Sequence, residues 1–117
     1  MTLALGVDLG GTNARAALVD ASTGAVVAAH KLPHTERSPA AVVATIAAAA
    51  REASRMAGVE LGSLGTAGVG VAGQCLGSTG TVLNAPNLGW RDVPLGELLH
   101  AALGLEVRVV NDLSAAA

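Results

Sequence analysis

Aromatic residues are nearly absent from this sequence. Its 117 residues include one tryptophan, Trp90, and no phenylalanine or tyrosine. A hydrophobic fraction of 51% nevertheless argues against intrinsic disorder. The core must therefore be built from alanine, valine and leucine, which bring backbones close together but bury less area per residue than aromatic side chains.

Lysine and cysteine are also scarce, and their scarcity excludes whole classes of protein. Lys31 is the sole lysine and the net charge is −2, so there is no basic stripe to neutralise a nucleic-acid backbone. Cys75 is the sole cysteine, which excludes an internal disulfide and a zinc-ligand cluster. Neither a signal peptide nor an apolar run long enough to span a bilayer is evident. We therefore expect a cytoplasmic protein that binds neither nucleic acid nor a membrane.

The order of apolar runs and turns predicts an α/β fold. Three short strands joined by tight turns predict an antiparallel meander, at residues 3–8, 14–20 and 25–32. An alanine-rich helix at 40–57 follows, with Ser38 as its cap and Gly58 at its end.

The second half of the chain predicts crossover units. A buried parallel strand is expected at 67–72, a helix at 94–103 and a last strand at 106–110. Residues 81–83 are expected to form a short arm, and residues 84–92 a loop. The order β-β-β-α-β-α-β predicts a mixed, five-stranded type of sheet with flanking helices, the ribonuclease-H-like arrangement of actin-like ATPases.

The segment after the first expected strand combines an acid with two glycines. Gly10 and Gly11 permit positive φ and let a bulky anion approach the main chain, and Thr12 and Asn13 add donors. Asp8 points a carboxylate at the same space, which fits a phosphate cradle if Mg²⁺ is held between them through water. A plain glycine hairpin with a polar rim is the alternative, although it does not explain Asp8. No Walker or Rossmann glycine motif occurs in the chain.

The pair Asn111-Asp112 follows the last expected strand. Ligands bind beyond the carboxyl ends of strands in open α/β sheets, and the expected topology puts Asp8 and Asp112 at the same edge. One carboxylate can serve a metal while the other accepts a proton from an attacking hydroxyl. Locally, Asp112 or Ser114 could instead cap a helix that begins in the following alanines.

Several residues between these two sites allow both structural and functional interpretations. Gly73 can let a sugar hydroxyl approach the main chain, or it can serve a bulge or turn. Asn84 and Asn87 bracket a stiffening proline and offer the donor and acceptor that suit a vicinal diol. Trp90 is expected to anchor this loop by packing rather than to stack on a sugar. The remaining histidines and the cysteine are expected to be surface, helix-end or filler positions: His30, His34, His100 and Cys75.

Taken together, these segments resemble the ROK family of repressors, open reading frames and kinases, and especially its glucokinases. The first motif alone is shared by many actin-like ATPases, whereas the loop at 86–90 with Asn-Asp at this distance is much more specific. The resemblance covers essentially the whole chain. It rests on Asp8-Leu9-Gly10-Gly11-Thr12-Asn13, Gly73, Pro86-Asn87-Leu88-Gly89-Trp90 and Asn111-Asp112.

The resemblance implies a hexose kinase of carbohydrate metabolism and glycolysis that uses ATP and Mg²⁺ to phosphorylate glucose at its 6-hydroxyl. It implies that ATP phosphates bind Gly10, Gly11, Thr12 and Asn13, with Asp8 near Mg²⁺. It implies that the hexose contacts four residues, of which the last is also the general base: Gly73, Asn87, Asn111 and Asp112. It also implies a homodimer, although the residues themselves do not specify an oligomeric state.

The resemblance also implies that part of the enzyme is missing. The family's downstream Glu-x-Gly-His motif, its cysteine-rich zinc loop and its adenosine-binding segments do not occur, and Val110 stands where members often have glutamate. We therefore expect residues 1–117 to be the N-terminal lobe of a two-lobe protein, called the full-length parent below, and to be inactive alone. The alternative is a non-catalytic sugar-sensing module of a ROK-type regulator, and the retained Asp112 favours the kinase. An actin- or Hsp70-like ATPase would leave the loop at 87–90 unexplained.

Overall fold

The computed structural model describes residues 2–111. Within this range two helices, one short 3-10 turn at Leu61–Ser63 and eight strands occur. The helices are α1 (Pro39–Ala57) and α2 (Leu95–Leu103). The strands are β1 (Leu3–Leu9), β2 (Asn13–Asp20), β3 (Val26–Pro33), β4 (Thr66–Val71), β5 (Gln74–Leu76), β6 (Thr81–Ala85), β7 (Trp90–Val93) and β8 (Glu106–Asn111).

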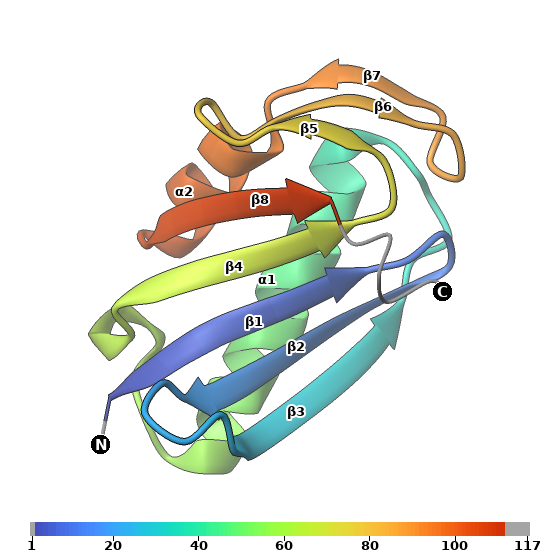
Figure 1. Cartoon of the computed structure of the whole chain (residues 1–117). Helices are drawn as coiled ribbons and strands as arrows, with labels where there is room; N and C mark the ends of the chain where they lie inside the picture. Colours follow the sequence, from blue (N-terminus) through green and yellow to red (C-terminus); the bar gives the residue numbers. More distant parts are fainter. Residues whose placement is uncertain (1, 112–117) are drawn as a thin grey trace.

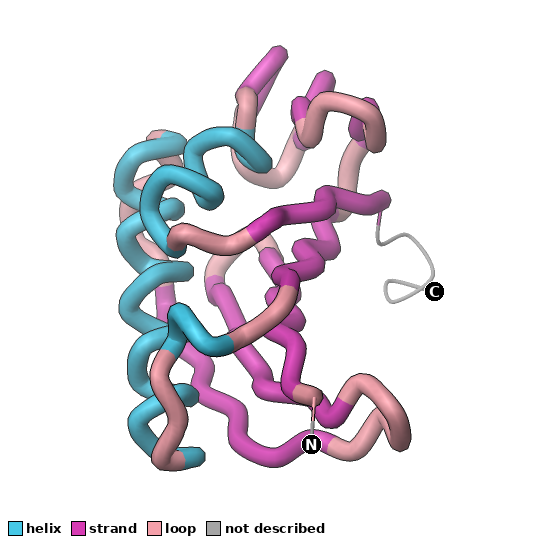
Figure 2. The backbone as a smooth tube through the Cα atoms, turned by 90° about the vertical axis from the view of Figure 1, so that its left-hand side faces the viewer, coloured by secondary structure: helices cyan, strands magenta, loops and turns pink. Residues whose placement is uncertain are grey.

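A five-stranded mixed sheet in the order β3-β2-β1-β4-β8 forms the centre of the molecule (Figure 1). β1, β2 and β3 pair antiparallel, while β4 pairs parallel with both β1 and β8. Both helices lie on one face of this sheet (Figure 2). The predicted α/β class, the meander and the crossover order are therefore confirmed.

The helix boundaries follow from local signals. The Ser38 hydroxyl accepts a hydrogen bond from the Ala41 N–H at 3.3 Å, and Pro39 occupies the first turn of α1. Gly58 and Gly104 end α1 and α2 with φ of 70° and 71°, a left-handed conformation that glycine adopts without a steric penalty. Each helix therefore ends close to the residue that the sequence predicted.

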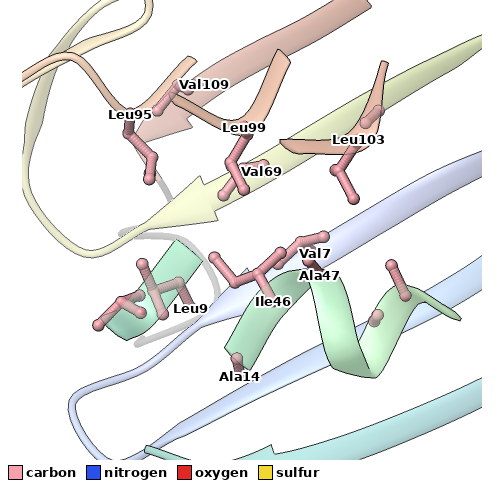
Figure 3. Close-up of a cluster of buried hydrophobic side chains, with 14 of the residues drawn as sticks. Val7, Leu9, Ala14, Ile46, Ala47, Val69, Leu95, Leu99, Leu103 and Val109 are labelled. Carbon is pink, nitrogen blue, oxygen red and sulfur yellow. The ribbon is translucent and has the colours of Figure 1, made fainter. Parts of the chain in front are cut away.

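The core lies between the sheet and the two helices (Figure 3). Alternate residues of each strand face the helices, as Val7 and Leu9 do on β1, because side chains of a strand point to opposite faces in turn. Ile46 of α1 and Leu99 of α2 are fully buried against that face. Most other core positions of α1 are alanines, which lets the helix backbone lie close to the sheet: Ala47, Ala49, Ala50 and Ala53.

A second, three-stranded sheet of order β5-β6-β7 was only partly predicted. The expected arm at 81–83 is the start of β6, and most of the expected loop at 84–92 belongs to β6 and β7, which pair antiparallel. The turn residues of this segment are confined to the connection between the two strands, so the prediction of a long loop was wrong. This small sheet packs beside the end of the main sheet at which β4 and β8 finish (Figure 1).

The other face of the main sheet carries no helix among residues 2–111. It has a shallow hollow of about 390 Å³, lined by small residues of β1 and β4 together with the side chains of Asp8 and Arg15. A second hollow, of about 450 Å³, lies at the C-terminal end of α1 and contains none of the predicted site residues. No helix in the described part of the chain is both long and apolar enough to cross a bilayer.

Candidate functional site

Three parallel strands end at one edge of the main sheet. Asp8 pairs with Gly70 of β4, and Asn111 pairs with Val71 one residue further along. β4 lies between β1 and β8, so Asp8 and Asn111 lie about 10 Å apart across two strand spacings. The topology thus brings these two predicted residues to the same edge, while Asp112 lies outside the described residues.

Residues 10–12, called the glycine turn, connect β1 to β2 at this edge. The Gly10 N–H donates to the Asn13 carbonyl at 2.9 Å, which closes the turn. The Asn13 side-chain amide donates to the Thr12 hydroxyl at 3.0 Å. The Thr12 oxygen accepts this bond, so the hydroxyl hydrogen can be donated to a ligand such as a phosphate oxygen.

The positive φ predicted for the glycines of this turn is not found. Positive φ among the described glycines occurs at Gly24, Gly58, Gly80, Gly89 and Gly104, so Gly10 and Gly11 are not in the left-handed region. A Cβ at Gly11 would instead lie 3.4 Å from the Cβ of Asn87. The glycine turn thus lies close to a loop more than seventy residues away in the sequence.

That neighbour is the loop of residues 86–89, called the asparagine loop, which connects β6 to β7. The Leu88 N–H donates to the Ala85 carbonyl at 3.0 Å, and the Gly89 N–H donates to the Pro86 carbonyl at 3.2 Å. Gly89 has φ of 68°, which allows the tight reversal. Leu88 is buried beneath the loop while Asn87 is exposed, so the loop presents its amide to solvent next to the glycine turn.

Trp90 fixes this loop to the segment between β3 and α1. Its ring is buried, and its indole N–H donates to the Arg37 carbonyl at 2.6 Å. The segment that carries Arg37 follows β3 and leads into α1. Trp90 is therefore a packing anchor, as the sequence predicted.

Gly73 lies between β4 and β5 and is surrounded by backbone. A Cβ at this position would lie 2.3 Å from the Asn84 carbonyl oxygen and 3.1 Å from the Ala85 Cα, so any side chain would force β6 to move. Close packing of two backbones therefore explains why this residue is glycine. The predicted contact between Gly73 and a sugar stays a prediction.

His34 is the residue at this edge that the sequence analysis placed wrongly. It is buried rather than on the surface, and its ring nitrogen Nε2 lies 2.7 Å from the Gly10 carbonyl oxygen. The signal that could have found it is the register of β2 and β3, which pairs Asn13 with Pro33 and so sets the next residue opposite Thr12. His100 does lie at a helix end, where its Nδ1 is 2.7 Å from the Leu105 carbonyl oxygen.

Asp8 has an exposed carboxylate at the end of β1, on the open face of the sheet. Among residues 2–111, no group of three His, Cys, Asp or Glu side chains is placed to hold a metal ion. Mg²⁺ keeps several waters and is bound in proteins through one or two carboxylates together with substrate phosphates. A single carboxylate beside the glycine turn is therefore a donor set that fits Mg²⁺ and does not fit a metal held by the protein alone.

Comparison with known proteins agrees with this arrangement. The sequence matches the ROK family over residues 4–117. It is 43% identical over 117 residues to a glucokinase of Streptomyces coelicolor, an alignment that covers all of this chain and 35% of that protein.

Two solved structures are similar to nearly the whole chain. The crystal structure of a ROK family glucokinase from Streptomyces griseus in complex with glucose and AMPPNP has a TM-score of 0.84 and 36% identity, covering 97% of this chain and 34% of that one. The ROK hexokinase from Thermus thermophilus has a TM-score of 0.83 and 29% identity, covering 99% of this chain and 37% of that one. The chain thus spans about a third of the length of its relatives, and its fold is that of their actin-like ATPase architecture. Because the family match covers nearly its entire length, the chain belongs to the ROK family.

Proposed function

We propose that this chain is the N-terminal lobe of an ATP-dependent hexose kinase that phosphorylates glucose at its 6-hydroxyl. The observation that carries the proposal is the close approach of Gly11 to Asn87, since a Cβ added at Gly11 would lie 3.4 Å from the Asn87 Cβ. It sets a turn suited to phosphate beside a loop suited to sugar hydroxyls, which is the juxtaposition that phosphoryl transfer between ATP and a sugar needs. The complex of the Streptomyces griseus relative with glucose and AMPPNP supports both ligand classes.

On the nucleotide side, the glycine turn would hold the phosphates. Its N–H groups and the Thr12 hydroxyl are the donors, and Asn13 orients that hydroxyl through its amide. Asp8 would hold Mg²⁺ through water at the end of β1. When bound, Mg²⁺ neutralises part of the charge on the phosphates.

On the sugar side, Asn87 would hydrogen-bond hydroxyls of the hexose from the asparagine loop, with Gly73 and Asn111 flanking it at the ends of β4 and β8. Asp112, the residue after β8, would accept the proton of the 6-hydroxyl as it attacks the phosphoryl group. Asp8 would then act near the metal, and Asp112 would act at the nucleophilic hydroxyl.

The rest of the enzyme would be supplied by a second lobe in the full-length parent. The coverage of 35% of the Streptomyces coelicolor glucokinase supports this division. Phosphoryl transfer depends on positioning and charge stabilisation in a closed cleft, not on one reactive group. We therefore expect residues 1–117 alone to show no sugar-dependent ADP release.

The test is a coupled assay of ADP release by the full-length parent with Mg-ATP and glucose, mannose, N-acetylglucosamine or fructose. Activity with glucose, and none from residues 1–117 under the same conditions, is the expected result. A parent that binds sugar but releases no ADP with any of these substrates would instead support a sugar-sensing module.

A further inference from the structure

We propose that His34 is a positioning residue for the glycine turn, holding it in the conformation that binds the phosphates of the nucleotide. The proposal rests on the proposed function, because it concerns how well the turn serves ATP. The assigned nucleotide residues are those of the turn itself and Asp8. His34 lies outside that set, on the segment that follows β3.

His34 contacts the glycine turn at two points. Its ring nitrogen Nε2 donates to the Gly10 carbonyl at 2.7 Å, and its backbone N–H donates to the Thr12 carbonyl at 2.9 Å. The first bond comes from the side chain and the second from the main chain. One residue thus holds both ends of the three-residue turn.

The two bonds also set the direction of N–H groups. In a trans peptide the carbonyl and the next N–H lie in one plane and point in opposite directions. Fixing the Gly10 carbonyl toward His34 therefore turns the Gly11 N–H away from it, and fixing the Thr12 carbonyl does the same for the Asn13 N–H. Preorganised N–H donors stabilise an anion without a cost of reorganisation when the ligand arrives.

The second ring nitrogen shows that packing alone does not explain a histidine here. Nδ1 is buried and has no hydrogen-bond partner among the described residues. An unpaired buried polar atom destabilises the folded chain, and a leucine would fill the space without that penalty. The imidazole donates a hydrogen bond from Nε2 to the Gly10 carbonyl, which a leucine side chain cannot do. This bond therefore gives the ring its role at the glycine turn.

The chain contains a matched control. His100 also binds a backbone carbonyl through one ring nitrogen, that of Leu105, at the same distance of 2.7 Å. Its bond joins the end of α2 to the start of β8, away from the glycine turn. Removing it should therefore affect stability without affecting the turn.

The experiment compares His34→Leu, His34→Gln and His100→Leu in the full-length parent by the KM for ATP, the KM for glucose and kcat. We expect His34→Leu to raise the KM for ATP about tenfold and to leave the KM for glucose within about twofold. Glutamine keeps an amide donor at the end of its side chain, so His34→Gln should restore the KM for ATP to near the wild-type value. His100→Leu should leave both KM values unchanged.

Three outcomes would overturn the proposal. Unchanged KM for ATP in His34→Leu, with an active wild type, would show that the turn holds its shape without the ring. Equal changes in both KM values, or the same change in His100→Leu, would show a general loss of structure. A wild type without ATP-dependent sugar phosphorylation would overturn the proposed function and this inference together. If His34→Leu does not fold, His34→Met supplies the same test, because its flexible side chain fills the space without a donor.

Discussion

The glycine turn and the asparagine loop meet at one edge of the main sheet, yet different forces hold them there. The glycine turn joins neighbouring strands and is fixed by backbone bonds and by His34. The asparagine loop belongs to a separate small sheet and is fixed by the buried Trp90, whose indole reaches back to Arg37. The first therefore depends on strand register, and the second depends on contacts between distant segments.

Because different contacts hold them, the two halves of the site should respond differently to substitution. Changes at the turn should alter ligand binding while the fold survives, because β1 and β2 are paired along their whole length. Changes beneath the loop should alter stability first, because the small sheet depends on its packing against the main one.

The largest effect on stability is expected for Gly73→Ala in residues 1–117. The new Cβ would lie 2.3 Å from the Asn84 carbonyl oxygen, so β6 must shift. Overpacking of this kind costs about 3 kcal/mol in the free energy of unfolding. Gly68→Ala, on β4, is the matched control, because a Cβ there meets nothing within 4 Å. Urea unfolding of both variants measures the difference, and equal losses would contradict the close approach of β6 to Gly73.

A second prediction concerns Gly11→Val in the full-length parent. The Cβ of valine would lie 3.4 Å from the Asn87 Cβ, and its two methyl groups would reach further and push the two parts of the site apart. The KM values for ATP and for glucose should therefore rise together, each by about tenfold. Gly11→Ala should change neither by more than about twofold, because its Cβ makes only an ordinary contact. A valine variant that changes the KM for ATP alone would show that the glycine turn and the asparagine loop are independent.

Trp90→Phe tests the anchor of the asparagine loop. The ring stays buried, but the hydrogen bond from the indole N–H to the Arg37 carbonyl is lost. The expected loss is about 1 kcal/mol in the free energy of unfolding of residues 1–117. Thermal unfolding measures it, and a variant as stable as the wild type would mean that packing alone holds the loop.

The smallest effect concerns Cys75 on β5, which the sequence analysis took as a filler. Burial raises the pKa of its thiol above the ordinary value. A raised pKa means that less thiolate is present at neutral pH, so alkylation by iodoacetamide should be slower in the folded chain than in urea. Equal rates in the two conditions would show that the thiol is not protected by the fold.

The elements predicted best from sequence are those with local signals. Ser38, Gly58 and Gly104 mark helix ends through the conformation of a single residue or turn, and the structure has them there. The meander and the crossovers followed from short turns and from the alternation of strands and helices. Local patterns were enough for the fold class.

What the sequence could not predict depends on contacts between distant segments. The hairpin of β6 and β7 is short and rich in polar residues, so its pairing could not be distinguished from a loop. The place of His34 depends on the register of β2 and β3, and the approach of Gly11 to Asn87 arises only when the two sheets come together. The positive φ predicted for Gly11 was therefore wrong, while the approach of an anion to its main chain stays a prediction.

The most direct test of the account is the variant Asp112→Asn in the full-length parent, measured for turnover and for glucose binding. The amide keeps the shape of the carboxylate and one accepting oxygen but cannot accept the proton of the 6-hydroxyl. We predict that kcat falls by about a hundredfold or more, since general-base catalysis contributes at least that much, while the Kd for glucose stays within about tenfold. A variant that keeps a near-wild-type kcat would contradict the assignment of this edge as the catalytic site of a sugar kinase, and would leave Asp112 as a helix cap.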